Sequence, residues 1–164
     1  MSIVPFDTLP DESRVWVFGS DRRLQGDDAE RLLADVDRFL AGWKAHGVPL
    51  RCARAWTEDH FLTIGVDTTI EGASGCSIDG LFRSLQQLER ALGTRLVAGG
   101  RVFYRDGSGQ PRAVARDEFS ALAERGEISA DTAVFDTSLT RLGDWRERFE
   151  QPAAAAWTAQ LLAR

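Results

Sequence analysis

The residues best suited to chemistry lie in one loop of mostly small residues, DTTIEGASGCSID, at positions 67–79. Small residues let a backbone approach a ligand closely, and Cys76 stands where the loop gives way to apolar residues at helical spacing. The free N–H groups and positive dipole of a helix N-terminus stabilise an anion, including the thiolate of a cysteine. We therefore predict an anion or ligand site in which Ser74, Gly75 and Ser77 surround Cys76.

His46 is the second group of this predicted site. It follows a helical stripe of apolar residues that begins near Asp27, so we expect it at the end of the first helix, where the dipole favours an imidazolium. A thiolate beside an imidazolium, with Asp67 or Asp79 orienting the ring, is the arrangement of an activated nucleophile. This pattern predicts a cysteine-dependent transferase or hydrolase.

Plainer interpretations of the same residues stay open. The glycines can simply shape a tight loop, Ser74 or Ser77 can cap the helix, and Cys76 can be a small buried apolar residue. His46 can be no more than a helix terminus, and the loop can bind an anion without catalysis. The sequence alone therefore leaves it open whether the protein is an enzyme.

A second candidate precedes the first helix in the run Ser20-Asp21-Arg22-Arg23. Arg22 and Arg23 can clamp a phosphate or a carboxylate through forked hydrogen bonds, close to His60 of a predicted hairpin. The alternative is a solvated turn with no ligand.

Several familiar mechanisms lack their residues. A nucleotide-binding P-loop needs Gly-Lys-Ser/Thr, whereas GASGCS has Cys at the Lys position and the chain's only lysine is Lys44. Two histidines and two cysteines without zinc-ligand spacing argue against a metal site, and the glycine-rich loop is not a hydrolase nucleophile elbow. We expect no metal and no cofactor.

The composition sets limits on partners and location. The chain has 164 residues, 43% of them hydrophobic, which is enough for one domain with its own core. A net charge of −5 argues against nucleic acid, and no apolar stretch reaches the length of a membrane span. Cys52 and Cys76 are expected as reduced thiols, and we predict a cytoplasmic protein.

The elements that must position these residues follow from apolar periodicity. The first helix begins at a capping box formed by Asp27 and Glu30 and stops at Gly47, and the second stops at Gly93. Around them the pattern predicts strands at 15–20, 50–57, 61–67 and 96–106, with Glu58-Asp59-His60 as a hairpin turn.

This order, βαββαβ, predicts an α+β protein with a ferredoxin-like core of two helices on one antiparallel sheet. In that topology the end of the first helix and the start of the second share one pole, which would bring His46 to Cys76. We assign residues 1–106 to this core and residues 107–164 to a C-terminal extension packed on it, with a helix at 116–125 closed by Gly126, a strand at 132–135 and an amphipathic segment after Pro152.

The segments VPFDTLPDESRVWVF, WKAHG, GVD, SGCSID and DTAVFDTSL together resemble a family of small uncharacterised bacterial proteins often labelled "ABC transporter ATPase". The resemblance covers most of the chain, and SGCSID is its most distinctive element. It implies no established activity, and it places His46 and Cys76 at positions that family members share. The ATPase label is incompatible with the missing P-loop lysine.

A second resemblance concerns the C-terminal extension. FYRDG, EFSALAERGEISADTAVF and Trp145 are similar to the second type of GYF-like domain, an adaptor fold that binds proline-rich peptides. This similarity competes for the strand at 96–106. It favours a nonenzymatic interaction module that holds a protein partner through aromatic residues such as Trp56 or Trp145. A homodimer formed through the sheet face or an edge strand is a further alternative.

Overall fold

The computed structural model describes residues 3–162 and shows an α+β protein with antiparallel sheets. The first sheet has the strand order β1-β5-β4, formed by Arg14–Gly19, Phe61–Val66 and Cys52–Thr57. The second has the order β7-β6-β8-β9, formed by Pro111–Ala115, Arg101–Arg105, Ala133–Phe135 and Glu150–Pro152. A small hairpin joins β2 (Lys44–Ala45) to β3 (Val48–Pro49).

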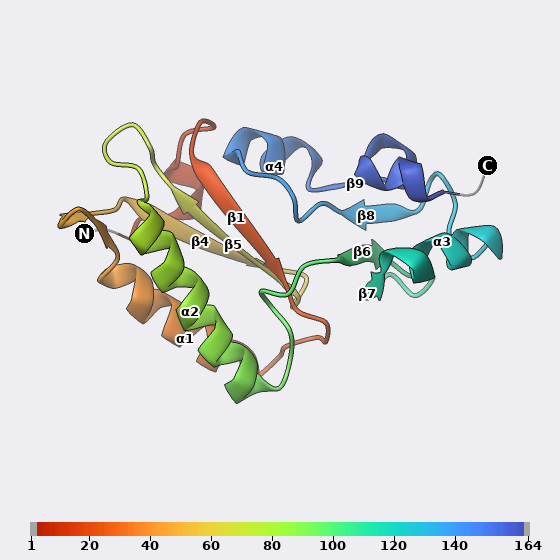
Figure 1. Cartoon of the computed structure of the whole chain (residues 1–164), viewed down its shortest axis with the longest axis horizontal. Coiled ribbons are helices and arrows are strands. Elements are labelled where there is room, and N and C mark those ends of the chain that lie inside the picture. The colour runs from red at the N-terminus through yellow and green to blue at the C-terminus, as the bar shows by residue number, and fades with distance from the viewer. Residues whose placement is uncertain (1–2, 163–164) are drawn as a thin grey trace.

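Four α-helices accompany these sheets in the described residues. They are α1 (Asp27–Ala41), α2 (Gly75–Leu92), α3 (Arg116–Glu124) and α4 (Leu142–Arg148). Short 3₁₀ turns occupy Phe6–Thr8, Ala153–Ala155 and Trp157–Leu161. Figure 1 shows α1 and α2 side by side along one face of the first sheet and α4 on its other side, with the second sheet and α3 at the other end of the molecule.

The first sheet is covered on both faces, which explains the nearly continuous apolar runs of its strands. Trp16, Phe18 and Ile64 belong to the cluster that packs against α1 and α2. Alternate residues point the other way, where Val15 meets the leader residue Leu9 and Leu142 of α4. In this way the N-terminal leader and the C-terminal extension supply the second layer over this sheet.

The helix α1 begins at Asp27 as predicted, but its predicted end and its predicted cap are wrong. The helix ends at Ala41 rather than Gly47, because Trp43 leaves the helical path and buries its ring in the core. The capping box is also absent: Gly26, with φ 57°, is the N-cap and provides no side-chain hydrogen bond, while Asp27 is already helical. By contrast, α2 ends as predicted at Gly93, whose left-handed backbone favours glycine.

The strand predicted at 96–106 does not complete the first sheet. Only Arg101–Arg105 is a strand, β6, and it pairs with β7 and β8 of the second sheet. Gly100, with φ 81°, turns the chain at this point, and Phe103 then packs among the aromatic rings of Phe61 and Phe135. Residues of the C-terminal extension therefore take the strand that was expected to complete the first sheet. The first sheet keeps β1, β4 and β5 and lacks the predicted fourth strand.

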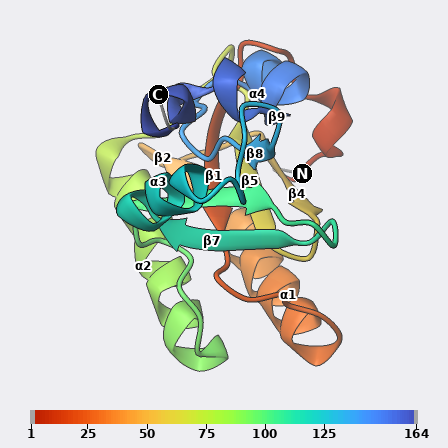
Figure 2. The ribbon, with the colours of Figure 1, turned by 90° about the vertical axis from the view of Figure 1, so that its right-hand side faces the viewer.

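Arg105 of β6 connects the second sheet to the hairpin turn between β4 and β5 of the first sheet. Arg105 bonds both carboxylate oxygens of Glu58 and both of Glu150, and its guanidinium lies over the ring of Phe135. These hydrogen bonds to Arg105 lower the pKa of Glu58. Figure 2 shows the resulting arrangement, in which α1 and α2 project away from the second sheet.

Candidate functional site

Cys76 lies in the first turn of α2 with its side chain exposed. Ser74 is the N-cap of this helix, and its hydroxyl accepts a hydrogen bond from the N–H of Ser77. The Ser77 hydroxyl donates to the Ser74 carbonyl at 2.7 Å. Both serines thus bind the start of their own helix, as in the capping interpretation, and the exposed Gly75 is its first residue.

His46 is not at a helix end, so that prediction is wrong. It lies at the exposed tip of the β2–β3 hairpin with a φ of 52°, because α1 stops at Ala41. The hairpin does meet the start of α2, since the Trp43 indole N–H donates to the carbonyl of Ser77. Within residues 3–162, however, no hydrogen bond or ion pair links Cys76 to His46.

The two carboxylates of the predicted site do not complete it either. Asp67 is buried and accepts bonds from the N–H and hydroxyl of Thr69, at 2.9 and 2.6 Å, and from Arg51 at 2.8 Å. The Thr69 hydroxyl is the main reason why the pKa of Asp67 is lowered. Asp79 is exposed on α2. The structure therefore shows Asp67 shaping the turn after β5, with no hydrogen bond or ion pair to either histidine among the described residues.

The arginines of the second predicted site point to different partners. Arg22 binds Asp28 and the Leu92 carbonyl at the end of α2, whereas Arg23 binds Asp59 in the hairpin turn. The backbone N–H of Ser20 donates to His60, so this turn does lie beside the hairpin as predicted. The two guanidiniums thus bind separate partners, and the anion clamp suggested by the sequence stays a prediction.

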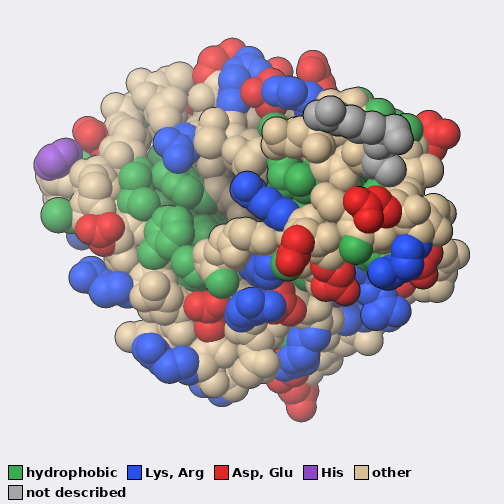
Figure 3. All heavy atoms as spheres, turned by 45° about the vertical axis from the view of Figure 1, so that its right-hand side comes forward, with side chains coloured by type: hydrophobic (Ala, Val, Ile, Leu, Met, Phe, Trp, Pro, Cys, Tyr) green, Lys and Arg blue, Asp and Glu red, His purple; other side chains and the backbone are tan. Residues whose placement is uncertain are grey.

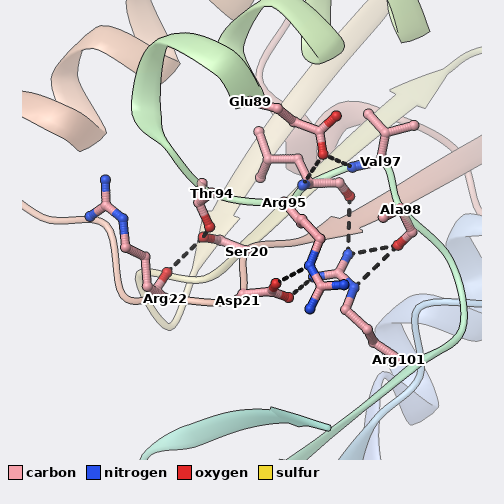
Figure 4. Close-up of polar contacts among 10 residues, drawn as sticks. Ser20, Asp21, Arg22, Glu89, Thr94, Arg95, Val97, Ala98 and Arg101 are labelled. Atoms are coloured by element: carbon pink, nitrogen blue, oxygen red, sulfur yellow. Dashed lines mark hydrogen bonds and ion pairs between the residues drawn. The ribbon is translucent and has the colours of Figure 1, made fainter. Parts of the chain in front are cut away.

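A network that the sequence analysis missed lies next to this turn. Asp21 accepts hydrogen bonds from Arg95 and from Arg101, and Arg101 also donates to the Ala98 carbonyl (Figure 4). Glu89 of α2 accepts the N–H groups of Leu96 and Val97 in the same link. These contacts hold the chain between α2 and β6 against the end of β1. Partners 74 to 80 positions apart leave no local signal in a sequence.

The edge of β1 that faces away from β5 is only partly paired. The Ser20 N–H donates to His60 beyond β5, whereas the Val15 N–H donates outward to Thr140 at 2.9 Å. Hydrogen bonding alternates along an antiparallel strand, so the N–H and C=O groups of Val17 and Gly19 also point outward. No backbone partner in residues 3–162 meets them.

These outward groups line a groove of about 270 Å³. Phe82 of α2 and Val97 form part of one wall, and Phe103 of the second sheet contributes to another. Residues 137–140 also line the groove, and Thr140 binds Val15 at one end of it. The lining also includes Trp16, Phe18, Leu96, Ala98, Gly99 and Gly100. Strand edge, helix and C-terminal extension thus meet in a single concave site.

The groove carries an asymmetric charge. Two arginines line it and no carboxylate does. Arg101 is ion-paired with Asp21, which also binds Arg95, and it donates to the Ala98 carbonyl, so its guanidinium is already occupied. Arg14 forms no ion pair with any described residue; its guanidinium lies 4.8 Å from the centre of the Trp16 ring, and its Nε lies 3.4 Å from the Val15 carbonyl. On the face drawn in Figure 3, hydrophobic side chains gather in a patch with basic side chains beside it.

Trp56 and Trp145, the two tryptophans predicted to recognise a partner, pack largely against other residues of this chain. Trp145 of α4 stacks on Phe149 and meets the edge of Phe6, with centroid distances of 5.5 and 5.3 Å. Trp56 packs against the cluster under α1 and α2. Their indole nitrogens are buried without a partner in the described chain. Neither tryptophan lines the β1 groove.

Cys52 is the second thiol and differs sharply from Cys76. It is buried in β4, where burial raises its pKa to about 11. Among residues 3–162, no group of three His, Cys, Asp or Glu side chains is arranged to hold a metal ion. The described helices also include none with the length and apolar character needed to cross a membrane.

Comparisons of the chain with protein-family models, curated proteins and solved structures found no match. The two resemblances stated from the sequence therefore stay predictions, and the function must be argued from the geometry of the groove.

Proposed function

We propose that this protein is a nonenzymatic interaction module that receives an extended segment of a partner protein along the free edge of β1. The observation that carries the proposal is the pair of outward-facing backbone positions at Val17 and Gly19 inside a groove. Strand addition of this kind derives affinity from main-chain hydrogen bonds and selectivity from pockets for alternate side chains.

The walls of the groove suit a strand better than a compact molecule. At about 270 Å³ the cavity is slightly smaller than typical small-molecule pockets, yet one side of it is a row of backbone donors and acceptors. A segment paired with Val17 and Gly19 would gain up to four main-chain hydrogen bonds. Phe82 and Phe103 would then contact its alternate side chains.

The topology supports the same proposal. In a complete ferredoxin-like layer, the sixth element of the βαββαβ order lies beside the first strand. Here β1-β5-β4 with α1 and α2 resembles that layer, and β6 pairs elsewhere. We propose that the partner strand takes the place beside β1. This agrees with the adaptor role expected for the C-terminal extension, which helps to build the groove.

The test uses random peptides displayed in two formats, either free at the C-terminus or embedded before a Gly-Ser tail, and selected on the intact protein. The tightest peptide of each format is then added to ¹⁵N-labelled protein. We expect the amides of Val17 and Gly19 to shift and to exchange more slowly with solvent.

The Val17 N–H points away from β5, so Val17→Pro removes it without removing a hydrogen bond between β1 and β5. Proline is tolerated at such strand edges. We expect Val17→Pro to weaken peptide binding at least tenfold, whereas the matched Val17→Ala, which keeps the N–H, should retain most of it; circular dichroism verifies the fold of both. Selection of no peptide, binding that leaves both amides unchanged, or a stable dimer that covers the edge in sedimentation would overturn the proposal.

A further inference from the structure

We infer that the groove accepts the C-terminal end of its partner, antiparallel to β1, with the terminal α-carboxylate at Arg14. This inference rests on the proposed strand addition and specifies its direction, its end point and the chemistry of the last residues. It depends on three independent features: where the free edge stops, where the unpaired positive charge lies, and which side chains form the walls.

The free edge stops abruptly at one end. The Val15 N–H already donates to Thr140, and Leu142 donates to the Ser13 carbonyl, so residues 140–142 occupy the edge beyond Val17. An added segment can pair with Gly19 and Val17 and must then end or turn away. A segment whose chain ends at Val17 fits this short edge. An internal segment would have to leave the groove around residues 137–140.

Charge selects the orientation. An antiparallel segment runs toward the start of β1, so its C-terminus arrives beside Trp16, where the guanidinium of Arg14 lies over the ring. Arginine recognises carboxylates through paired, charge-assisted hydrogen bonds. A parallel segment would bring its N-terminal ammonium to the same arginine and be repelled. At the other end, the Arg101 guanidinium is already occupied by Asp21 and by the Ala98 carbonyl, whereas Arg14 has no ion-pair partner among the described residues.

The register then indicates the side chains. In an antiparallel pair, residues directly opposite each other share a face of the sheet. The penultimate residue would face Phe18 and point to the helix side, toward Phe82 and Val97, so it should be apolar. The residue before it would lie opposite Gly19, which contributes no side chain, beside the ring of Phe103. We therefore expect free C-termini with an apolar penultimate residue.

The decisive measurement is fluorescence polarisation with the tightest free-acid peptide from the display, compared with its C-terminal amide and with the same peptide extended by Gly-Ser. We expect the amide and the extended peptide to bind at least tenfold more weakly. Arg14→Gln should abolish this preference for the free acid, and Arg14→Lys should restore part of it. Arg116→Gln is the matched control, because Arg116 also lies over a tryptophan ring, Trp157, but outside the groove.

The outcomes separate the two proposals. Equal binding of acid, amide and extended peptide, with shifts at Val17 and Gly19, would overturn the terminal carboxylate and leave strand addition standing. A preference for the acid that survives Arg14→Gln would also overturn it. Failure of every peptide to bind would overturn the proposed function and this inference together.

Discussion

The ring of Phe103 fills the space that a side chain at residue 19 would need. An ideal Cβ placed on Gly19 would lie 2.8 Å from both Cε atoms of that ring and closer still to its tip. Glycine is required here by close approach and not by an unusual backbone angle. This contact seats the second sheet on the end of β1 and forms one boundary of the groove.

Gly19→Ala should therefore destabilise the protein by about 1–3 kcal/mol, the usual cost of overpacking a core. Urea denaturation measures the loss. In Gly107→Ala, where an added Cβ meets nothing within 4 Å, the change should stay within about 0.5 kcal/mol. Combining Gly19→Ala with Phe103→Leu should cost less than the sum of the single changes; strict additivity would show that the two residues do not compete for space.

Asp21 is expected to be important for stability because its partner Arg101 has a side chain only 7% exposed. Asp21→Asn would leave that guanidinium without a carboxylate, and because Asp21 itself is 26% exposed we expect a loss of about 1–3 kcal/mol, as for a hydrogen bond to a charged group. Glu127→Gln, which removes the exposed pair with Arg125, should change the free energy of unfolding by less than about 1 kcal/mol. Equal small effects of both changes in urea denaturation would contradict this role for Asp21.

The two thiols should react very differently. Iodoacetamide should label the exposed Cys76 in the folded protein, while Cys52 should react only after unfolding, since it is buried and its pKa is raised to about 11. Peptide mass spectrometry distinguishes the sites. Because no hydrogen bond joins Cys76 to His46, we expect His46→Ala to leave the labelling rate at pH 6.5 unchanged. Fast labelling that depends on His46 would instead support the predicted nucleophile.

Acid should weaken the turn after β5. The pKa of Asp67 is lowered in the folded protein, chiefly by the Thr69 hydroxyl, so its stabilisation is present above the usual carboxyl pKa of about 3.9 and is lost as the pH falls through the lowered value. Asp67→Asn should cost about 1–3 kcal/mol at pH 7 and progressively less in acid. Urea titrations across this pH range test it, with Asp79→Asn, at an exposed position, as the control. A constant difference at all pH values would contradict the assignment.

Local patterns predicted much of the first sheet and its helices. Alternation and helical spacing identified β1, β4, β5 and α2, because each buries apolar residues at a regular period, and Gly93 and Gly126 mark helix ends that need a left-handed residue. The end of α1 was misplaced because the stripe continues through Trp43, which is buried although it lies outside the helix. Periodicity reports burial and cannot tell whether the backbone is still helical.

The candidate groove could not be predicted from the sequence. Its existence depends on β6 pairing with β8 rather than β1, and this choice is made by contacts such as Phe103 with Phe135, which are far apart in the chain. For the same reason Cys76, the most conspicuous residue in the sequence, is joined to none of its predicted partners by a hydrogen bond. Residue types suggested chemistry at that loop, whereas the open positions Val17 and Gly19 carry no distinctive side chain at all.

The short length of the open edge at β1 also bears on solubility at high concentration. Unpaired strand edges are templates on which copies of a protein can stack into fibrils. Here only Val17 and Gly19 are available, with residues 140–142 already paired on one side and the link held by Arg101 on the other. A neighbouring molecule would have to offer a chain end to enter, so the same confinement that favours a terminus discourages growth into an extended cross-β stack.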